Sequence, residues 1–146
     1  MRNFKFRGKH FSSVNPEDSY WVHGSTLKQY NTDRSHIVSI NSIIVSEDTV
    51  GEFTGLYDMN GQEIYEGDIL RIPAKSDWEK TNFTAFEVFW HDNDDANKHI
   101  GWQMNRLHFQ GAICGMDTGL ITFLPRYVRQ MVVIGNIYDN PELMKR

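Results

Sequence analysis

The residues best suited to do chemistry are the carboxylates of one segment, residues 52–72. Glu66 and Asp68 are two positions apart, and alternate positions of an extended strand share one face. Two carboxylates on one face are the pair that a hydrolase uses as general acid and general base. The competing interpretation is structural, because Asp and Glu beside a bend accept hydrogen bonds from nearby backbone N–H groups. The composition of Glu66-Gly67-Asp68 is typical of a bend and favours this second interpretation.

A second group of candidate residues follows Pro125. Arg126, Tyr127 and Arg129 combine two guanidinium groups with an aromatic ring, a set that can hold a phosphate or stack on a nucleobase. The alternative is the edge of a strand or a turn with two solvated arginines. The formal net charge of −4 favours that alternative, because nucleic-acid-binding surfaces are usually basic.

Metal and nucleotide sites are not indicated. The polar run at residues 91–98 lacks the alternating ligands, the central Gly and the closing Glu of a calcium loop. The glycine-rich run at residues 110–119 lacks the Lys and Ser or Thr of a phosphate-binding loop. Both runs are interpreted as loops, and the one cysteine, Cys114, as a small buried apolar residue. We therefore expect no metal ion, no cofactor and no catalytic residue.

The segment that carries the carboxylates is predicted to be a hairpin, a bend and a strand. Asp58-Met59-Asn60-Gly61 lies between two apolar runs and has the residues of a type I turn whose Gly adopts a positive φ. Gly67 supplies the bend that follows. Ile69–Ile72 is then a strand that Pro73 ends, because proline has no N–H to donate to a neighbouring strand.

The same segment carries a family resemblance. Residues 53–69 read Phe-Thr-Gly-Leu-Tyr-Asp-Met-Asn-Gly-Gln-Glu-Ile-Tyr-Glu-Gly-Asp-Ile, which resembles the signature of the YopX family of small phage and prophage proteins. The likeness extends to residues 4–9 and 21–25 near the start and to residues 133–143 near the end, whereas residues 77–81 and 110–129 match nothing in it. The resemblance implies a mainly β protein of unknown biochemical function, and it supplies no catalytic residues.

The most distinctive positions are interpreted as structural. Backbone geometry explains Gly and Asn where the chain turns. Asn136 interrupts an apolar run, and if it is buried we expect it to bond to the backbone through its side-chain amide. These signature positions are Gly55, Asp58, Asn60, Gly61, Tyr65, Glu66, Gly67, Asp68, Gly135 and Asn136.

Composition and periodicity indicate a mainly β fold in one domain spanning residues 1–146. Aromatic residues make up 13% of the chain, which favours packed sheets over disorder. A long connection separates the strand that ends at Ile72 from the regularly alternating strand Phe83–Trp90, which suggests an SH3-like small barrel core among antiparallel strands and hairpins. Two subregions are indicated, an N-terminal β part at residues 1–50 and a barrel-like part at residues 51–146. The alternative is an α+β fold.

Further strands are predicted from alternation and from β-branched residues. Arg2–Arg7 and Tyr20–Gly24 are expected to pair as a hairpin. This pairing would bring Arg7 near His23, either as an anion site or as two solvent-facing residues. The other predicted strands are Leu27–Tyr30, Ile37–Val45, Ile100–Met104, Arg106–Phe109, Leu120–Leu124 and Met131–Tyr138.

Two connections have weaker signals. Residues 74–82 are predicted to form a polar loop with Trp78 partly exposed. Asn140-Pro141 has the order of an N-cap followed by proline at the first helical position, so a short helical turn is predicted there.

These features favour a non-enzymatic protein. Because Tyr and Trp are common anchors of interfaces, the leading hypothesis is a phage or prophage accessory protein that binds an unidentified protein or forms a homo-oligomer. The first alternative is a nucleic-acid-binding barrel that uses Arg126, Tyr127 and Arg129, which the net charge disfavours, and the second is a hydrolase that uses Glu66 and Asp68. Without a bilayer-spanning apolar run or a signal peptide, a cytoplasmic protein in the host cell, away from the membrane, is expected.

Overall fold

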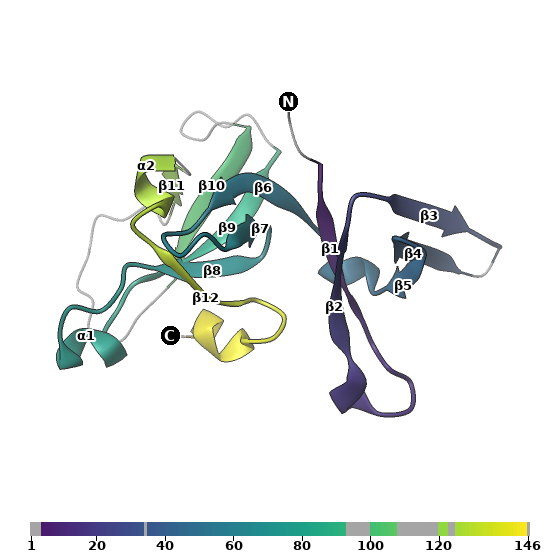
Figure 1. Cartoon of the computed structure of the whole chain (residues 1–146), viewed down its shortest axis with the longest axis horizontal. Coiled ribbons are helices and arrows are strands. Elements are labelled where there is room, and N and C mark those ends of the chain that lie inside the picture. Colours follow the sequence, from purple (N-terminus) through teal and green to yellow (C-terminus); the bar gives the residue numbers. More distant parts are fainter. Residues whose placement is uncertain (1–3, 34, 93–99, 108–119, 123–124, 146) are drawn as a thin grey trace. The chain divides into compact units, whose positions relative to one another are not determined.

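The computed structural model describes residues 4–33, 35–92, 100–107, 120–122 and 125–145. The described chain is mainly β, with antiparallel sheets and short helices (Figure 1). The predicted mainly β fold is therefore confirmed. The structure includes a curled half-barrel, and the narrower SH3-like assignment stays a prediction.

The chain divides into two compact units, Met1–Gly55 and Leu56–Arg146. The division falls inside strand β6 (Gly51–Tyr57), a few residues beyond the boundary between residues 50 and 51 that the sequence suggested.

One sheet of the first unit contains the predicted N-terminal hairpin. Strand β1 (Phe6–His10) pairs with β2 (Tyr20–Gly24) along its full length, and its first residues pair with the start of β6. The hairpin is confirmed, although β1 begins at Phe6 rather than at the predicted Arg2. The short 3-10 helix η1 (Pro16–Asp18) lies in the connection between β1 and β2.

The other sheet of the first unit corrects one prediction. Its order is β3 (Leu27–Asn31), β4 (His36–Ile40) and β5 (Ile43–Val45), so the single strand predicted over residues 37–45 is wrong. Asn41 and Ser42 interrupt it with φ angles of 49° and 70°. A two-residue hairpin turn of type I′ needs positive φ at both central positions, which Asn tolerates well. The surrounding β-branched residues concealed this turn.

The 3-10 helix η2 (Glu47–Thr49) connects β5 to β6.

The core of the first unit is small and aliphatic. The buried side chains come from β2, β4 and β5, whose alternate residues point to a common interior. They are Val22, Val38, Ile40 and Val45.

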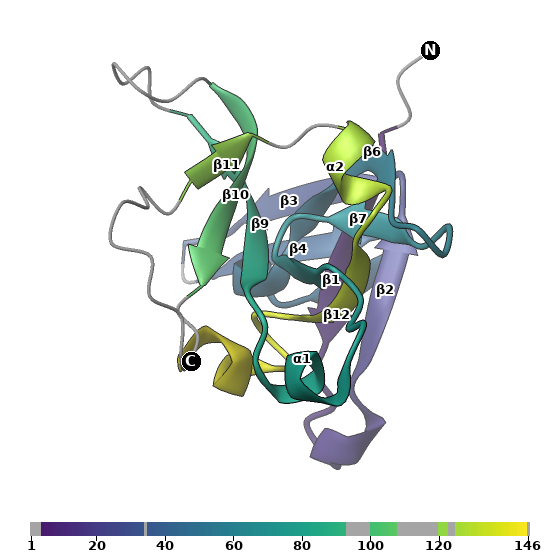
Figure 2. The same ribbon diagram turned by 90° about the vertical axis from the view of Figure 1, so that its left-hand side faces the viewer.

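The second unit is built on a five-stranded antiparallel sheet of order β11-β10-β9-β8-β12 (Figures 1 and 2). Each strand pairs with its neighbours through antiparallel registers. The bounds are β8 Asp68–Arg71, β9 Ala85–His91, β10 Gly101–Leu107, β11 Leu120–Thr122 and β12 Val132–Asn136.

Strand β10 is continuous where two strands were predicted. It pairs with β9 over its whole length, and Asn105 lies opposite Glu87 within this pairing. Asn105, which lay between the two predicted strands, is a half-buried residue within β10. Phe109, the predicted end of the second strand, lies outside the described residues, as do residues 93–99 and 110–119 with Cys114.

The described part of the second unit also contains three short helical segments. The predicted polar loop contains the helix α1 (Asp77–Thr81), and the predicted edge or turn after Pro125 is the helix α2 (Pro125–Val128). The helical turn predicted after Asn140 is confirmed as η3 (Pro141–Lys145). No helix within the described ranges is long and apolar enough to cross a membrane.

Two clusters of buried side chains pack on the five-stranded sheet. The larger cluster combines the hairpin strand β7 (Glu63–Tyr65), alternate residues of the sheet and the helix α2, and it contains Ile64, Leu70, Phe86, Val88, Met104, Val128 and Met131. The smaller cluster uses the opposite alternation of β8, β9 and β10, and it contains Ile69, Ala85 and Leu107.

Candidate functional site

The turn between β6 and β7 is built around the carboxylate of Asp58. Gly61 donates its N–H to the Asp58 carbonyl over 3.0 Å and has a φ of +79°, which confirms the predicted turn. The Asp58 carboxylate, 5% exposed, accepts the N–H groups of Asn60 (2.8 Å), Gln62 (2.9 Å) and Val133 (3.0 Å). The first two bonds shape the turn, and the third joins it to β12.

The bend at residues 66–68 separates the two carboxylates that were considered for hydrolysis. Strand β7 ends at Tyr65, Gly67 has a φ of +91°, and β8 begins at Asp68. Glu66 and Asp68 therefore do not share the face of one strand, and the predicted bend is confirmed. The Asp68 carboxylate is 1% exposed and accepts the N–H of Tyr65 over 2.8 Å, so it acts on the backbone as the structural interpretation predicted.

The remaining signature positions have comparable roles. The Asn136 side-chain oxygen accepts the N–H groups of Tyr138 (3.0 Å) and Asp139 (2.8 Å), which confirms the predicted bonding to the backbone and ends β12. A side chain at Gly135 would overlap that of Asn140. The Tyr65 hydroxyl donates to the Glu63 carboxylate, and Gly55 has a φ of +87°.

One carboxyl group of the sheet has a perturbed pKa. The pKa of Glu87 on β9 is raised above its usual value, first because burial disfavours the charged form and second because the Glu66 carboxylate lies nearby. A carboxyl with a raised pKa favours folding while it is protonated, and this contribution is lost as the pH rises through the pKa of the folded state.

We therefore expect Glu87→Gln to be more stable than the wild type at pH 7, with the difference shrinking toward pH 4, where wild-type Glu87 binds its proton. Thermal unfolding of both proteins at the two pH values measures this. Glu17→Gln, on the exposed helix η1, is the matched control. A stabilisation of the same size at both pH values would contradict the assigned cause.

The arginine and tyrosine set after Pro125 lies on and beside α2. The Arg126 guanidinium is 5.0 Å from the centre of the Tyr127 ring, and both residues are exposed, as is Arg129. Val128 between them is buried in the core, which anchors the helix. Exposed arginines fit both alternatives, and the backbone is helical rather than the predicted strand edge or turn.

Arg7 and His23 are opposite each other in the β1–β2 pairing, as predicted. Arg7 is nonetheless buried, and its guanidinium stacks 4.7 Å from the centre of the Trp21 ring. The interpretation of Arg7 as a solvent-facing residue is therefore wrong.

A cleft of about 440 Å³ lies in the second unit, at the end of the five-stranded sheet. Most of its lining comes from the connection between β8 and β9, which carries α1. Figures 1 and 2 show α1 at the lower end of the sheet. Its volume is within the range of about 300–1,000 Å³ that is typical of ligand pockets. Aromatic and cationic side chains dominate the lining: Trp78, Phe83, Phe86, Arg71, Lys75 and Arg106.

Arg71 holds one wall of the cleft in place. Its guanidinium lies 4.0 Å from the centre of the Phe83 ring and donates hydrogen bonds of 2.9 Å to the carbonyl oxygens of Ile72 and Glu79. A guanidinium can combine such stacking with several in-plane hydrogen bonds. Arg71 thus joins the end of β8 to α1.

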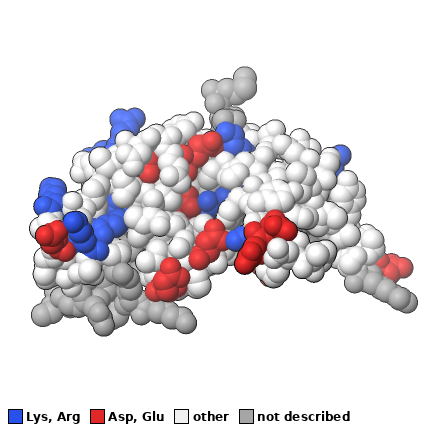
Figure 3. Space-filling model, turned by 60° about the horizontal axis from the view of Figure 1, so that its bottom comes forward, with Lys and Arg blue, Asp and Glu red and all other residues white. Residues whose placement is uncertain are grey.

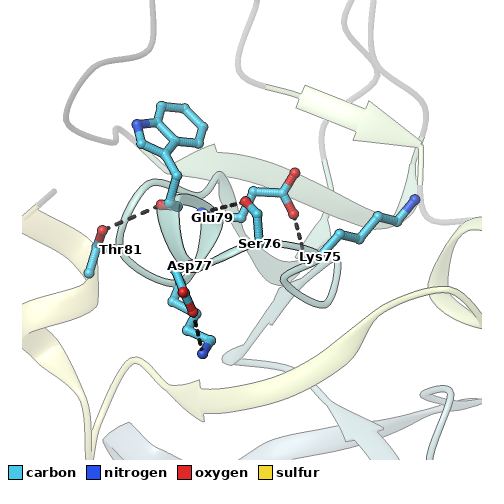
Figure 4. Close-up of polar contacts among 7 residues, drawn as sticks. Lys75, Ser76, Asp77, Glu79 and Thr81 are labelled. Atoms are coloured by element: carbon cyan, nitrogen blue, oxygen red, sulfur yellow. Dashed lines mark hydrogen bonds and ion pairs between the residues drawn. The ribbon is translucent and has the colours of Figure 1, made fainter.

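The helix α1 is stabilised by local polar contacts, shown in Figure 4. The Ser76 hydroxyl accepts the Glu79 N–H over 3.2 Å, and the Glu79 carboxylate accepts the Lys75 N–H. This Ser-x-x-Glu arrangement is a helix-capping signal that the sequence contained and the loop prediction missed. These contacts hold Trp78 on the first turn of α1. Its side chain is 64% exposed, which agrees with the partial exposure predicted from the sequence.

Arg106 enters the same cleft from β10. It pairs across the sheet with Phe86, and its guanidinium is 5.7 Å from the centre of that ring. Within the described part of the chain, no three His, Cys, Asp or Glu side chains are grouped closely enough to hold a metal ion. The cleft therefore offers an exposed aromatic ring and cationic side chains to a molecule that enters it.

Comparison with known families decides the relationship of this chain. A family model described as YopX protein matches residues 5–145. The chain belongs to the YopX family. The match covers nearly the whole chain and extends the resemblance that the sequence showed at its centre and near its ends.

Other comparisons add little to this YopX-family assignment. No curated protein matches the chain. Among solved structures, it is similar to the crystal structure of protein EF1440 from Enterococcus faecalis, with 20% identity and a TM-score of 0.44. That similarity covers 97% of this chain and 96% of the other.

Proposed function

We propose that this YopX-family protein is a non-enzymatic binding module whose cleft takes a segment of another protein. The supporting observation is the cleft itself, which presents Trp78 on a short capped helix at its opening. Tryptophan and arginine are enriched among the residues that contribute most to protein–protein binding, and such residues cluster in pockets. From the family resemblance alone, we infer an accessory protein of a phage or prophage that acts in the cytoplasm of the host.

The carboxylates of the signature positions support a binding role over hydrolysis. The carboxylates of Asp58 and Asp68 are buried and accept backbone N–H groups. A catalytic acid or base must instead reach the proton of a bound substrate. The cleft offers cations and aromatic rings, which recognise side chains and do not by themselves supply an acid and base pair.

Selection from a random peptide display library on the immobilised full chain tests this function. We expect the selected peptides to bind Trp78→Ala at least about tenfold more weakly than the wild type, because the variant removes the aromatic anchor. Fluorescence anisotropy with labelled peptides measures the change. Tyr30→Ala is the matched control, since Tyr30 is an exposed aromatic residue of the first unit.

A second measurement distinguishes binding of another protein from self-association. Self-association through the same cleft would appear as a concentration-dependent dimer in light scattering that Trp78→Ala abolishes. Peptides that bind the wild type and Trp78→Ala equally well, or a selection that enriches none together with a strictly monomeric chain, would overturn the proposed function.

A further inference from the structure

We propose that the cleft selects acidic partners: a protein segment that places an apolar side chain against Trp78 and a carboxylate on the Lys75 side chain. This inference rests on the proposed function, because it names the chemistry of the ligand for that same site.

Charge is the first argument. The cleft is lined by three cationic side chains and by one carboxylate, that of Glu79. The chain as a whole carries a net charge of −4, so this local surplus of positive charge is opposite in sign to the protein. Basic side chains gather at the left-hand end of the view in Figure 3, with carboxylates beside them. An acidic segment complements the local charge without needing a broadly basic surface.

The contacts that the cationic side chains of the cleft already make indicate which of them binds the ligand. Arg71 already donates to two carbonyl oxygens and stacks on Phe83, so its role is to position α1. Lys75 is exposed, and Figure 4 shows its side chain extending away from the helix. Lys75 is therefore the cation assigned to contact the ligand, and Arg106, whose guanidinium lies over the Phe86 ring, adds positive charge to the lining.

The net charge of the chain favours a short acidic segment over a nucleic acid. A polyanion would be repelled by the net negative charge of the chain, whereas a short acidic segment presents few charges and meets them locally.

The apolar part of the cleft supplies the second half of the recognition. Trp78 is exposed, and the rings of Phe83 and Phe86 line the interior beside Ile72 and Pro73. Burying an apolar side chain against this surface removes it from water, which contributes binding free energy that charge alone does not. The ligand is thus both acidic and apolar.

Arrayed synthetic peptides of about eight residues test the inference, a length typical of linear recognition segments. Three matched sets share the same apolar residues, and their intervening positions carry Asp or Glu, Asn or Gln, or Lys. The labelled full chain and a single-stranded oligothymidine probe are measured in parallel at low and high salt. We expect the acidic set to bind about tenfold more tightly than the amide set, with the difference reduced at high salt.

Charge reversal in the cleft provides the second readout. Lys75→Glu should weaken binding of the acidic set by about three- to tenfold and leave the amide set nearly unchanged. Lys28→Glu, an exposed lysine on β3 of the first unit, is the matched control. Because both lysines are exposed, thermal unfolding should show that both variants remain folded.

The possible failures are distinguishable. If the amide set binds as tightly as the acidic set, or if Lys75→Glu changes nothing, the acidic specificity is overturned while the proposed function stands. If no peptide binds and oligothymidine does, both the specificity and the proposed function are overturned.

Discussion

Replacing Asp58 with alanine is expected to reduce the free energy of unfolding by about 3–5 kcal/mol. The carboxylate accepts three backbone N–H groups, those of Asn60, Gln62 and Val133, and it is almost completely buried. A hydrogen bond to a charged group contributes about 1.5–3 kcal/mol, and water can replace part of this at the exposed residues Asn60 and Gln62. Since natural domains are stable by only about 5–15 kcal/mol, this one change would remove a large share of the total.

Urea unfolding, followed by tryptophan fluorescence and circular dichroism, measures this loss. Asp58→Asn keeps one acceptor oxygen and should lose less than Asp58→Ala. Asp33→Ala makes the same chemical change at an exposed turn of the first unit, and it should stay within about 0.5 kcal/mol of the wild type. An Asp58→Ala protein that unfolds at the wild-type urea concentration would show that the carboxylate does not hold the turn to β12.

Replacing Gly67 with alanine is expected to cost about 2–4 kcal/mol, from two separate causes. The φ of +91° disfavours any residue with a Cβ, by about 1–2 kcal/mol. The added Cβ would also lie 3.0 Å from the ring of Tyr138. The backbone has little freedom to move away, because the Gly67 N–H donates to Val88 O (2.8 Å) and its carbonyl accepts the Ile137 N–H (2.9 Å).

Two other glycines separate these causes. Gly61 and Gly55 also have positive φ, at +79° and +87°, but a Cβ on either would meet no atom within 4 Å. Alanine at those positions should therefore cost only the backbone part, about 1–2 kcal/mol. Equal losses for Gly67→Ala and Gly61→Ala in the same urea experiment would show that the contact with Tyr138 contributes nothing.

The signature positions and the cleft residues have different roles. Signature residues such as Asp58, Asp68 and Asn136 accept hydrogen bonds from backbone N–H groups and shape turns. The cleft instead depends on α1. The residues of this helix, 77–81, lie outside the motifs that carried the family resemblance. The family relationship therefore identifies the scaffold, and the binding proposal comes from residues outside its most distinctive motif.

The sequence by itself determined the turns and the mainly β character. A type I turn ending in Gly61, a bend at Gly67 and a helical turn after Asn140 depend on φ preferences and on bonds between residues a few positions apart, which are local and therefore visible in the chain. The turn at Asn41-Ser42 was missed, because the β-branched residues on either side of it predicted one continuous strand.

Only the tertiary structure decided which residues meet. Asp58 reaches Val133 across 75 positions of sequence, and Arg71, Trp78 and Arg106 come to one cleft from β8, α1 and β10. Such contacts follow from strand order and register, which depend on how the buried faces pack together and not on the preference of any single residue. The carboxylate pair suggested by Glu66 and Asp68 failed because of a local feature, the bend at Gly67, whereas the cleft depends on strand order and register and could not be foreseen from the sequence.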